Sequence, residues 1–171
     1  MTVLVLSDTH GRRTRIEDVL AIHSRYDCLA FLGDGLRDIE GASVPQNGLC
    51  AVRGNCDVFS LGACDAPTER VLCLDGVRIL MMHGHTHSVK SGVEAAAAYA
   101  YDRGADVLLY GHTHVADNTY FPAGSRIGGV VTERPLYVFN PGSLGEPRYG
   151  KASYGVMEIR NGSVLLSHGT I

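Results

Sequence analysis

The chain has 171 residues, of which 45% are hydrophobic, and this length suits one domain with a sizeable core better than two. We therefore expect a single domain over residues 1–171. The net charge is −3 with neutral histidines, and no run of like charges indicates a nucleic-acid-binding face. No stretch approaches the length of a membrane span, and Met1 leads into the apolar run without a signal-peptide pattern, so we expect a cytoplasmic protein.

The cysteines favour neither a disulfide framework nor a thiolate zinc site. There are five, an odd number, and no two form a Cys-x-x-Cys pair. Cys28, Cys50 and Cys73 lie in apolar runs, where a free thiol behaves as a small hydrophobic group.

The first part of the chain predicts a strand, a polar loop and a helix. Residues 3–6 are a continuous apolar run, which is typical of a buried strand. Thr14 and Glu17 have the spacing of a capping box, and the apolar face after them predicts a helix to about His23. Short apolar runs followed by polar loops predict further strands at residues 28–32 and 49–52.

The middle of the chain predicts a loop, a hairpin and a helix. Residues 61–69 lose periodicity, and we expect an exposed loop beside a substrate entrance. Asp75-Gly76 is a two-residue turn signal of the type I′ kind between strands at 70–74 and 77–82. Ser91 and Glu94 again have capping-box spacing, which predicts a helix that runs to Arg103, with Gly104 just beyond its end.

The last part predicts strands and a second hairpin. Residues 107–110 and 136–139 are apolar strands, and the glycine-rich stretch 118–135 between them is predicted as loop. Asn161-Gly162 predicts a hairpin of strands at 154–159 and 164–167. Early helices and late hairpins favour an α/β fold with one mixed sheet or two packed sheets.

The polar loops after the apolar runs carry residue types that bind transition metals. His112 and His114 are separated by one residue, so in an extended segment both imidazoles lie on one side. Because the carboxyl ends of strands in an open α/β sheet lie along one edge, we expect these loops to converge. Seven oxygen and nitrogen ligands suit two metal ions. They are Asp8, His10, Asp34, Asn55, His83, His112 and His114.

Five ordered motifs resemble those of the calcineurin-like metallophosphoesterase superfamily: Asp8-x-His10, Gly33-Asp34, Gly54-Asn55, His83-x-His85 and Gly111-His112-x-His114. In its length and in its Gly-Asn-Cys-Asp motif, the chain resembles the small YfcE-like phosphodiesterases of this superfamily. The segment Asn140–Ser143 resembles the family's late loop. The resemblance implies a metallophosphoesterase-like β-sandwich of two mixed sheets flanked by helices, a four-layer αββα arrangement.

The resemblance also implies a metal-dependent phosphohydrolase, most of all a phosphodiesterase, that acts on a small phosphoester. A metal-bridging hydroxide would attack phosphorus in line with the leaving group. By the family pattern, one ion is bound by Asp8, His10 and His114, the other by Asn55, His83 and His112, and Asp34 bridges them. These ligands suit two divalent transition-metal ions; we expect Mn²⁺ first, while Ni²⁺, Fe²⁺ and Zn²⁺ also fit.

One position departs from the pattern, because many superfamily members have a histidine where this chain has Cys56. A thiol with an ordinary pKa of about 8.5 is a poorer proton donor than imidazolium, so we expect acidic leaving groups such as aryl or nucleotide esters. His85, two residues beyond His83, is the substitute candidate; otherwise it supports the metal ligands. Asp57 is expected to orient the Asn55 loop, and the simpler interpretation of Cys56 is a packed side chain rather than a nucleophile.

Two alternative interpretations stay open. The first is a non-catalytic scaffold on the same fold, resembling the retromer subunit. Such relatives have substitutions around the metal-ligand positions, whereas this chain has the full set of ligands. A structural or sensing metal site would give stabilisation by metal without turnover. A homodimer is the default expectation for the oligomeric state.

Overall fold

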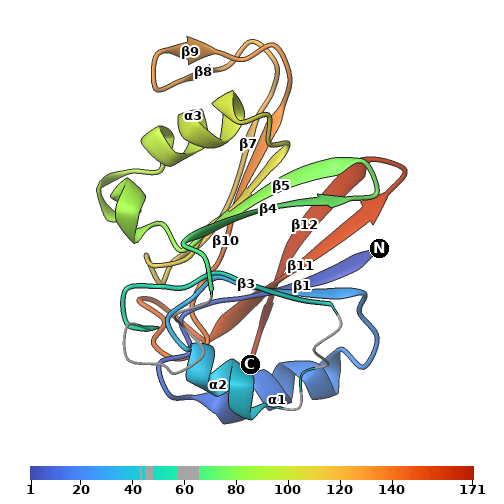
Figure 1. Ribbon diagram of the computed structural model, residues 1–171, viewed down its shortest axis with the longest axis vertical. Helices are drawn as coiled ribbons and strands as arrows, with labels where there is room; N and C mark the ends of the chain where they lie inside the picture. Colours follow the sequence, from blue (N-terminus) through green and yellow to red (C-terminus); the bar gives the residue numbers. More distant parts are fainter. Residues whose placement is uncertain (43, 45–47, 58–65) are drawn as a thin grey trace.

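The computed structural model describes residues 1–42, 44, 48–57 and 66–171. Two five-stranded β-sheets pack face to face, with helices on both outer sides (Figure 1). The first sheet has the order β12-β11-β1-β2-β3 and consists of β1 (Thr2–Leu6), β2 (Cys28–Phe31), β3 (Leu49–Ala51), β11 (Ser153–Arg160) and β12 (Ser163–Thr170). The second has the order β4-β5-β6-β10-β7 and consists of β4 (Glu69–Leu74), β5 (Val77–Met82), β6 (Val107–Leu109), β7 (Ala116–Phe121) and β10 (Leu136–Pro141).

Both sheets are mixed. In the first, β1 runs parallel to β2 and antiparallel to β11. In the second, β6 runs parallel to β5 and β10, while β4 and β7 are antiparallel edge strands. A short hairpin of β8 (Arg126–Ile127) and β9 (Val130–Val131) forms a separate two-stranded sheet.

The helices form the outer layers, which confirms the predicted αββα arrangement. The first sheet is covered by α1 (Arg13–Ile22) and α2 (Leu36–Gly41), and the second by α3 (Glu94–Asp102) (Figure 1). Two 3₁₀ helices, η2 (His85–His87) and η3 (Val89–Ser91), precede α3. No helix in the described ranges is long and apolar enough to cross a membrane.

Strand β5 shows why the central strands are apolar on both sides. Its Ile79 and Met81 pack between the sheets, whereas Leu80 and Met82 pack under α3, because successive strand side chains point to opposite faces. All four are at most 1% exposed. Burial of each such side chain stabilises the fold by about 1.5–3 kcal/mol, so a strand between two layers needs a continuous apolar run.

The strand predictions are confirmed to within three residues at each end, including both hairpins. Asp75 and Gly76 have φ values of +48° and +80°, which are the positive values that a type I′ turn requires. Gly104, at φ +76°, lies just beyond α3 as predicted.

Both capping-box predictions are wrong. Helix α1 begins at Arg13, so Thr14 lies inside it, because a turn from Arg12 N–H to the Thr9 carbonyl (2.9 Å) starts the helix early. Before α3, Ser91 is part of η3, and Val93 occupies the N-cap position. In both cases backbone bonds of the preceding turn override the local capping signal.

The loop predictions need two corrections. Residues 118–121 belong to β7, which was missed because an edge strand carries polar residues and alternates between exposed and half-buried positions. The 126–131 stretch forms the β8–β9 hairpin. Of the predicted loop 61–69, residues 61–65 lie outside the described residues, and Glu69 begins β4.

Candidate metal centre

The loops that carry the predicted ligands meet at one end of the sandwich, where parallel strands from both sheets end. In the first sheet, Asp8 N–H donates to the Gly33 carbonyl (3.0 Å) and His10 N–H to the Asp34 carbonyl (3.2 Å). In the second sheet, Gly111 N–H donates to the His83 carbonyl (3.1 Å). Backbone bonds therefore tie together loops that are distant in sequence, as expected for the carboxyl edge of parallel strands.

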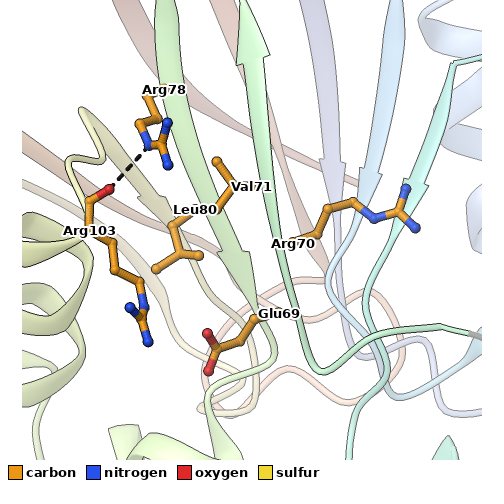
Figure 2. Close-up of a pocket in the computed structure, with 6 residues that line it drawn as sticks. All are labelled: Glu69, Arg70, Val71, Arg78, Leu80 and Arg103. Atoms are coloured by element: carbon orange, nitrogen blue, oxygen red, sulfur yellow. Dashed lines mark hydrogen bonds between the residues drawn. The ribbon is translucent and has the colours of Figure 1, made fainter.

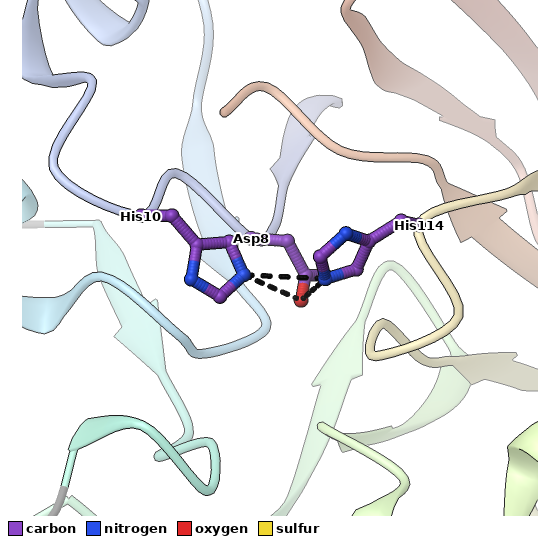
Figure 3. A group of neighbouring side chains, drawn as sticks. All are labelled: Asp8, His10 and His114. Carbon is purple, nitrogen blue, oxygen red and sulfur yellow. Dashed lines mark hydrogen bonds and ion pairs between the residues drawn. The ribbon is translucent and has the colours of Figure 1, made fainter. Parts of the chain in front are cut away.

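Asp8, His10 and His114 form the first group of potential ligands (Figure 3). The two imidazole rings approach the Asp8 carboxylate from opposite sides. His114 Nε2 lies 3.1 Å from Asp8 Oδ1, and His10 Nε2 lies 3.7 Å from the same oxygen. The two Nε2 atoms are 3.2 Å apart, so three potential ligand atoms face a common point.

Asp34, His83 and His112 form the second group. His83 Nε2 lies 3.3 Å from Asp34 Oδ2, and the rings of His83 and His112 have centroids 4.9 Å apart. The two groups are adjacent, because His10 Nε2 is 3.9 Å from Asp34 Oδ2 and His83 Nε2 is 4.0 Å from Asp8 Oδ1. His112 and His114 are thus divided between the groups.

Neighbouring carbonyls orient two of the imidazoles. His83 Nδ1–H donates to the Leu32 carbonyl and His114 Nδ1–H donates to the Glu146 carbonyl, each at 2.7 Å. In the neutral form of each ring the proton is on Nδ1, and the Nε2 lone pair is then directed at the centre. This arrangement is the usual way in which a protein prepares a histidine for a metal.

The carboxylate of Asp8 is prepared in a similar way. Its Oδ2 accepts hydrogen bonds from Ser7 Oγ and from His112 N–H (3.1 Å), which leaves Oδ1 toward the centre. Asp8 Oδ1 and His83 Nε2 are buried and make no hydrogen bond with any described residue. Buried polar atoms without hydrogen bonds are costly, and a cation between them would satisfy both, so this donor set fits a metal ion.

Five of the seven predicted ligands have a strained backbone. Eight non-glycine residues among those described have a positive φ, and they include Asp8 (+54°), His10 (+44°), Asp34 (+57°), His112 (+66°) and His114 (+59°). The expected extended His112–His114 segment is therefore wrong: it is a bent loop of left-handed residues. Such strain concentrates at functional sites, where the surrounding fold enforces it.

Asp57 joins the loop after β2 to the loop after β3. Its buried carboxylate accepts four backbone N–H bonds, from Asp34, Gly35, Leu36 and Gly54, at 2.8–2.9 Å. A Cβ at Gly54 would collide with the Asp34 carboxylate, which explains a glycine at that position.

The family model of the calcineurin-like phosphoesterase superfamily domain matches residues 1–162. The chain belongs to this superfamily. A probable metallophosphoesterase of Bacillus subtilis, YsnB, is 30% identical over 94% of this chain and 86% of its own length. The phosphodiesterase YfcE of Escherichia coli K12 is 30% identical over 92% of this chain and 88% of its own length.

Solved structures share the fold of this calcineurin-like chain. A predicted phosphoesterase from Streptococcus pneumoniae matches with a TM-score of 0.72 and 24% identity, over 99% of this chain and 88% of the other. A single-substitution variant of Vps29 from Entamoeba histolytica matches with a TM-score of 0.70 and 22% identity, over 100% of this chain and 99% of the other. At these identities the likeness shows the fold alone.

Burial and neighbouring charges set the protonation of this calcineurin-like site. Burial raises the pKa of Asp8, but the imidazoles of His10 and His114 outweigh it and hold that pKa well below its usual range. Burial likewise opposes the His83 imidazole at Asp34, whose pKa falls to about 2. Burial, followed by the charge of His83, lowers the pKa of His112 to about 4. In the metal-free protein the Asp8 carboxylate raises the pKa of His10 and His114, and at His83 the carboxylates outweigh burial and raise the pKa as well. Metal ions bind ionised carboxylates and neutral imidazoles, so binding would release protons from these rings.

Cys56 and Asn55 lie on the exposed side of the same region. Cys56 N–H donates to Asp34 Oδ1 (2.7 Å), and Cys56, His10 and Asp34 form a third group of potential ligands. The Cys56 side chain is exposed, so its simpler interpretation as a packed residue is wrong. The exposed Asn55 donates its side-chain amide to Cys56 Sγ (3.3 Å). Partial desolvation by its neighbours and the Asp34 carboxylate raise the pKa of the Cys56 thiol to about 11.

The spacing predicts that His85 continues the extended segment of His83, and this prediction is wrong. Gly84 turns the chain at φ +101°, and His85 begins η2. Its ring nevertheless lies 5.4 Å from that of His83 and 6.1 Å from that of His112. Its Nδ1 is buried without a hydrogen bond to any described residue, and burial, followed by the charge of His83, lowers its pKa.

Sequence reasoning singled out the late segment Asn140–Ser143 but did not predict its contacts, which fix the ligand loops. Asn140 Nδ2 donates to the Gly111 carbonyl (3.0 Å) and to Thr113 Oγ1 (3.1 Å). Ser143 Oγ donates to the Asp8 carbonyl (2.8 Å). The turn-type sequence was the available signal, whereas the carbonyls of Leu32 and Glu146 leave no trace in the sequence.

A cavity of about 490 Å³ lies on the outer face of the second sheet, where β4 and β5 meet the end of α3 (Figure 2). It is lined by Glu69, Arg70, Val71, Arg78, Leu80 and Arg103. Arg70 points away from the other five side chains. None of the predicted site residues lines this cavity.

Proposed function

We propose that this chain is a phosphodiesterase that hydrolyses small phosphoesters with the help of two divalent transition-metal ions. The carrying observation is the convergence of Asp8, Asp34 and four imidazoles, with buried ligand atoms that lack hydrogen bonds among the described residues. Membership of the superfamily and the names of YsnB and YfcE support a phosphoesterase activity.

The ligands divide into two sets in this proposal. Asp8, His10 and His114 bind one ion, and Asp34 bridges to the other. His83, His112 and Asn55 complete the second set, with Mn²⁺ as the first expectation and Ni²⁺, Fe²⁺ or Zn²⁺ as alternatives. The carboxylates and imidazoles of the two groups, Asp8 with His10 and His114 and Asp34 with His83 and His112, lie close enough together to support this division.

When bound, divalent ions polarise phosphoryl oxygens and lower the pKa of water into the neutral range. The chain itself sets the charge of the site. Asp8 and Asp34 carry about −2 in total, and the neutral ligands add nothing, so the loaded centre keeps about +2 and attracts a phosphate anion. Because the pKa values of both carboxyl groups are lowered, Asp8 and Asp34 stay ionised near neutral pH and this net charge does not change there.

The groups beside the centre favour leaving groups that depart without a proton. The Cys56 thiol, with a pKa raised to about 11, stays protonated but is a weak acid. The lowered pKa of His85 keeps its imidazole neutral at neutral pH, so it is a poor proton donor in the metal-free state. Aryl and nucleotide esters meet this condition better than alkyl esters.

The test is hydrolysis of bis(p-nitrophenyl) phosphate with added Mn²⁺. Asp34→Ala and His112→Ala are expected to lose at least about 100-fold in rate, since even residues that only support metal ligands cost 10–100-fold. His23→Ala is the matched control, because its imidazole bonds to Tyr154 OH (2.9 Å) and belongs to neither group. If the wild type and the variants all fail to hydrolyse the diester with every metal tried, the proposal is contradicted.

A non-catalytic scaffold is the second candidate, and the likeness to Vps29 is the observation that favours it. One Vps29 structure of the same fold is a complex with Zn²⁺, at 21% identity and a TM-score of 0.67. Metal binding alone therefore does not distinguish the candidates. Bound metal with no hydrolysis of any diester or monoester would favour the scaffold.

A further inference from the structure

A second cavity opens beside the candidate centre, and we call it the His114 cavity. Its volume is about 360 Å³, and His114 lies at its boundary together with Tyr149, Lys151 and His168. The chain reaches it from three directions: the start of β7, the loop before β11 and the end of β12.

The loop that carries Tyr149 and Lys151 is bonded to the candidate centre. Glu146 supplies the carbonyl that accepts from His114 Nδ1–H (2.7 Å), and Arg148 N–H donates to the His114 carbonyl (3.0 Å). A molecule held at the centre by its phosphate would therefore have this loop within reach. The cavity and the proposed site share one residue, His114.

His168 provides an aromatic surface that is fixed in place. Its ring stacks on Phe139, with centroids 4.5 Å apart and planes inclined by 20°. Its Nε2–H donates to the Asn140 carbonyl (2.7 Å), which leaves Nδ1 as a hydrogen-bond acceptor. Because the stacking and the hydrogen bond already fix this imidazole, it loses little conformational entropy when a ligand packs beside it.

Tyr149 and Lys151 are available for a ligand. Tyr149 is 74% exposed, the largest exposed fraction among the large hydrophobic residues of the described chain. In the described ranges its ring makes no aromatic contact, and the exposed Lys151 ammonium makes no ion pair. An uncovered aromatic ring and a free cation beside a cavity match an aromatic ring that carries hydrogen-bond acceptors.

We propose that the His114 cavity receives an aromatic substituent of the phosphoester, such as a nucleobase, and that Tyr149 and Lys151 determine this preference. The inference rests on the proposed function, because it requires the phosphate to bind at the centre. The volume of about 360 Å³ lies in the lower part of the range for small-molecule pockets, about 300–1,000 Å³, which fits one aromatic group. This preference is separate from leaving-group acidity, because it acts on binding.

Binding of two matched ligands tests the cavity without any turnover. Adenosine 5′-monophosphate and ribose 5-phosphate share the phosphate and the sugar, and only the first has a base. Titration calorimetry on the Mn²⁺-loaded protein is expected to show about 3- to 10-fold tighter binding of the nucleotide, as aromatic stacking supplies. Tyr149→Ala should bring this ratio close to one, and Tyr149→Phe should preserve it.

Lys151→Gln should lower the ratio about 2- to 3-fold, because the ammonium no longer faces the acceptors of the base. Two controls lie elsewhere on the surface. Tyr120→Ala removes an exposed tyrosine of β7, and Arg160→Gln removes an exposed cation at the far end of β11. Both controls should keep the wild-type ratio.

The outcomes separate the two proposals. A wild-type ratio of one, or a ratio that Tyr149→Ala leaves unchanged, overturns the cavity assignment even if the protein hydrolyses diesters. A ratio that depends on Tyr149 in a protein that hydrolyses nothing supports the cavity while it contradicts the proposed phosphodiesterase. Melting temperatures of the variants, measured beside the titrations, identify any loss of folding.

Discussion

Asp57→Asn is expected to destabilise the metal-free protein strongly, although the two side chains have the same shape. Asp57 Oδ1 accepts from the N–H groups of Gly35 and Leu36 (2.9 Å each), and Oδ2 accepts from those of Asp34 and Gly54 (2.8 Å each). An amide keeps one of these oxygens and places NH₂ where the other stood. Two backbone donors then lose their acceptor in a residue that is 2% exposed.

The magnitude follows from the two lost bonds. A buried donor left without a partner costs about 1–3 kcal/mol, so the pair predicts a loss of about 2–6 kcal/mol in the free energy of unfolding. That loss is a large fraction of the 5–15 kcal/mol (roughly) typical of a domain. Asp75→Asn is the matched control, because the exposed Asp75 accepts a single N–H from Asn161 (3.0 Å) that an amide oxygen can keep.

Urea unfolding in the presence of EDTA, followed by circular dichroism, measures the effect apart from any bound metal. With a urea dependence of about 2 kcal/mol per molar, the midpoint of Asp57→Asn should fall by about 1–3 M, while that of Asp75→Asn stays within experimental error. A loss below about 1 kcal/mol for Asp57→Asn, or an equal loss for both variants, refutes the role of this carboxylate as the joint between the two loops.

Three further predictions concern the ligands and the core. Elemental analysis should find that His114→Ala loses mainly the ion held with Asp8 and His10, and His112→Ala mainly the ion held with His83; anomalous scattering that shows the reverse contradicts the division. Burial and the neighbouring Cys50 raise the pKa of Cys28 from 9.0 to about 12, so the unfolded chain ionises first and stability is lost as pH rises from about 9 toward 12. Cys28→Ala should flatten the fall in urea midpoint between pH 8 and pH 10 (roughly), and an unchanged slope would contradict this cause. In metal-free protein, His112→Gly should be more stable than His112→Ala by about 0.5–1 kcal/mol, because glycine tolerates the φ of +66°. At His87, which lacks a positive φ, the order should reverse, and the same order at both positions would count against strain at His112.

The strands were predictable because their signals are local. Residues 77–82 must be apolar on both faces to lie between two layers, and Asp75-Gly76 ahead of them supplies the two positive φ values of the turn. Strand β7 lacks such a signal, since only one of its sides packs and its sequence, from Ala116 to Phe121, is largely polar. A polar edge strand takes its position from its neighbour β10, which a local pattern does not contain.

The convergence of the two carboxylates and four imidazoles was predictable for a different reason. Each follows an apolar run, and parallel strands bring their carboxyl ends together whatever the loops look like. The groups that support the ligands were not predictable, because they are mostly main-chain atoms. The carbonyls of Leu32 and Glu146 fix two imidazoles, and no residue type at either position encodes that contact. His85 illustrates the same limit, since the turn at Gly84 removed it from the extended segment that its spacing predicted.

The strain at the candidate centre shows that the fold, and not local preference, sets its geometry. A left-handed conformation costs an L-residue roughly 1–2 kcal/mol, somewhat less for Asp and Asn, so the five affected ligand positions together cost about 5 kcal/mol or more. Glycine at those positions would avoid the cost but would carry no ligand atom. The backbone bonds of Asp8 to Gly33 and of His10 to Asp34, and the bond of His112 N–H to the Asp8 carboxylate, hold the strained loops without any metal. A site with this construction is arranged before an ion arrives, and the free energy of the core therefore offsets the strain that metal binding would otherwise have to overcome.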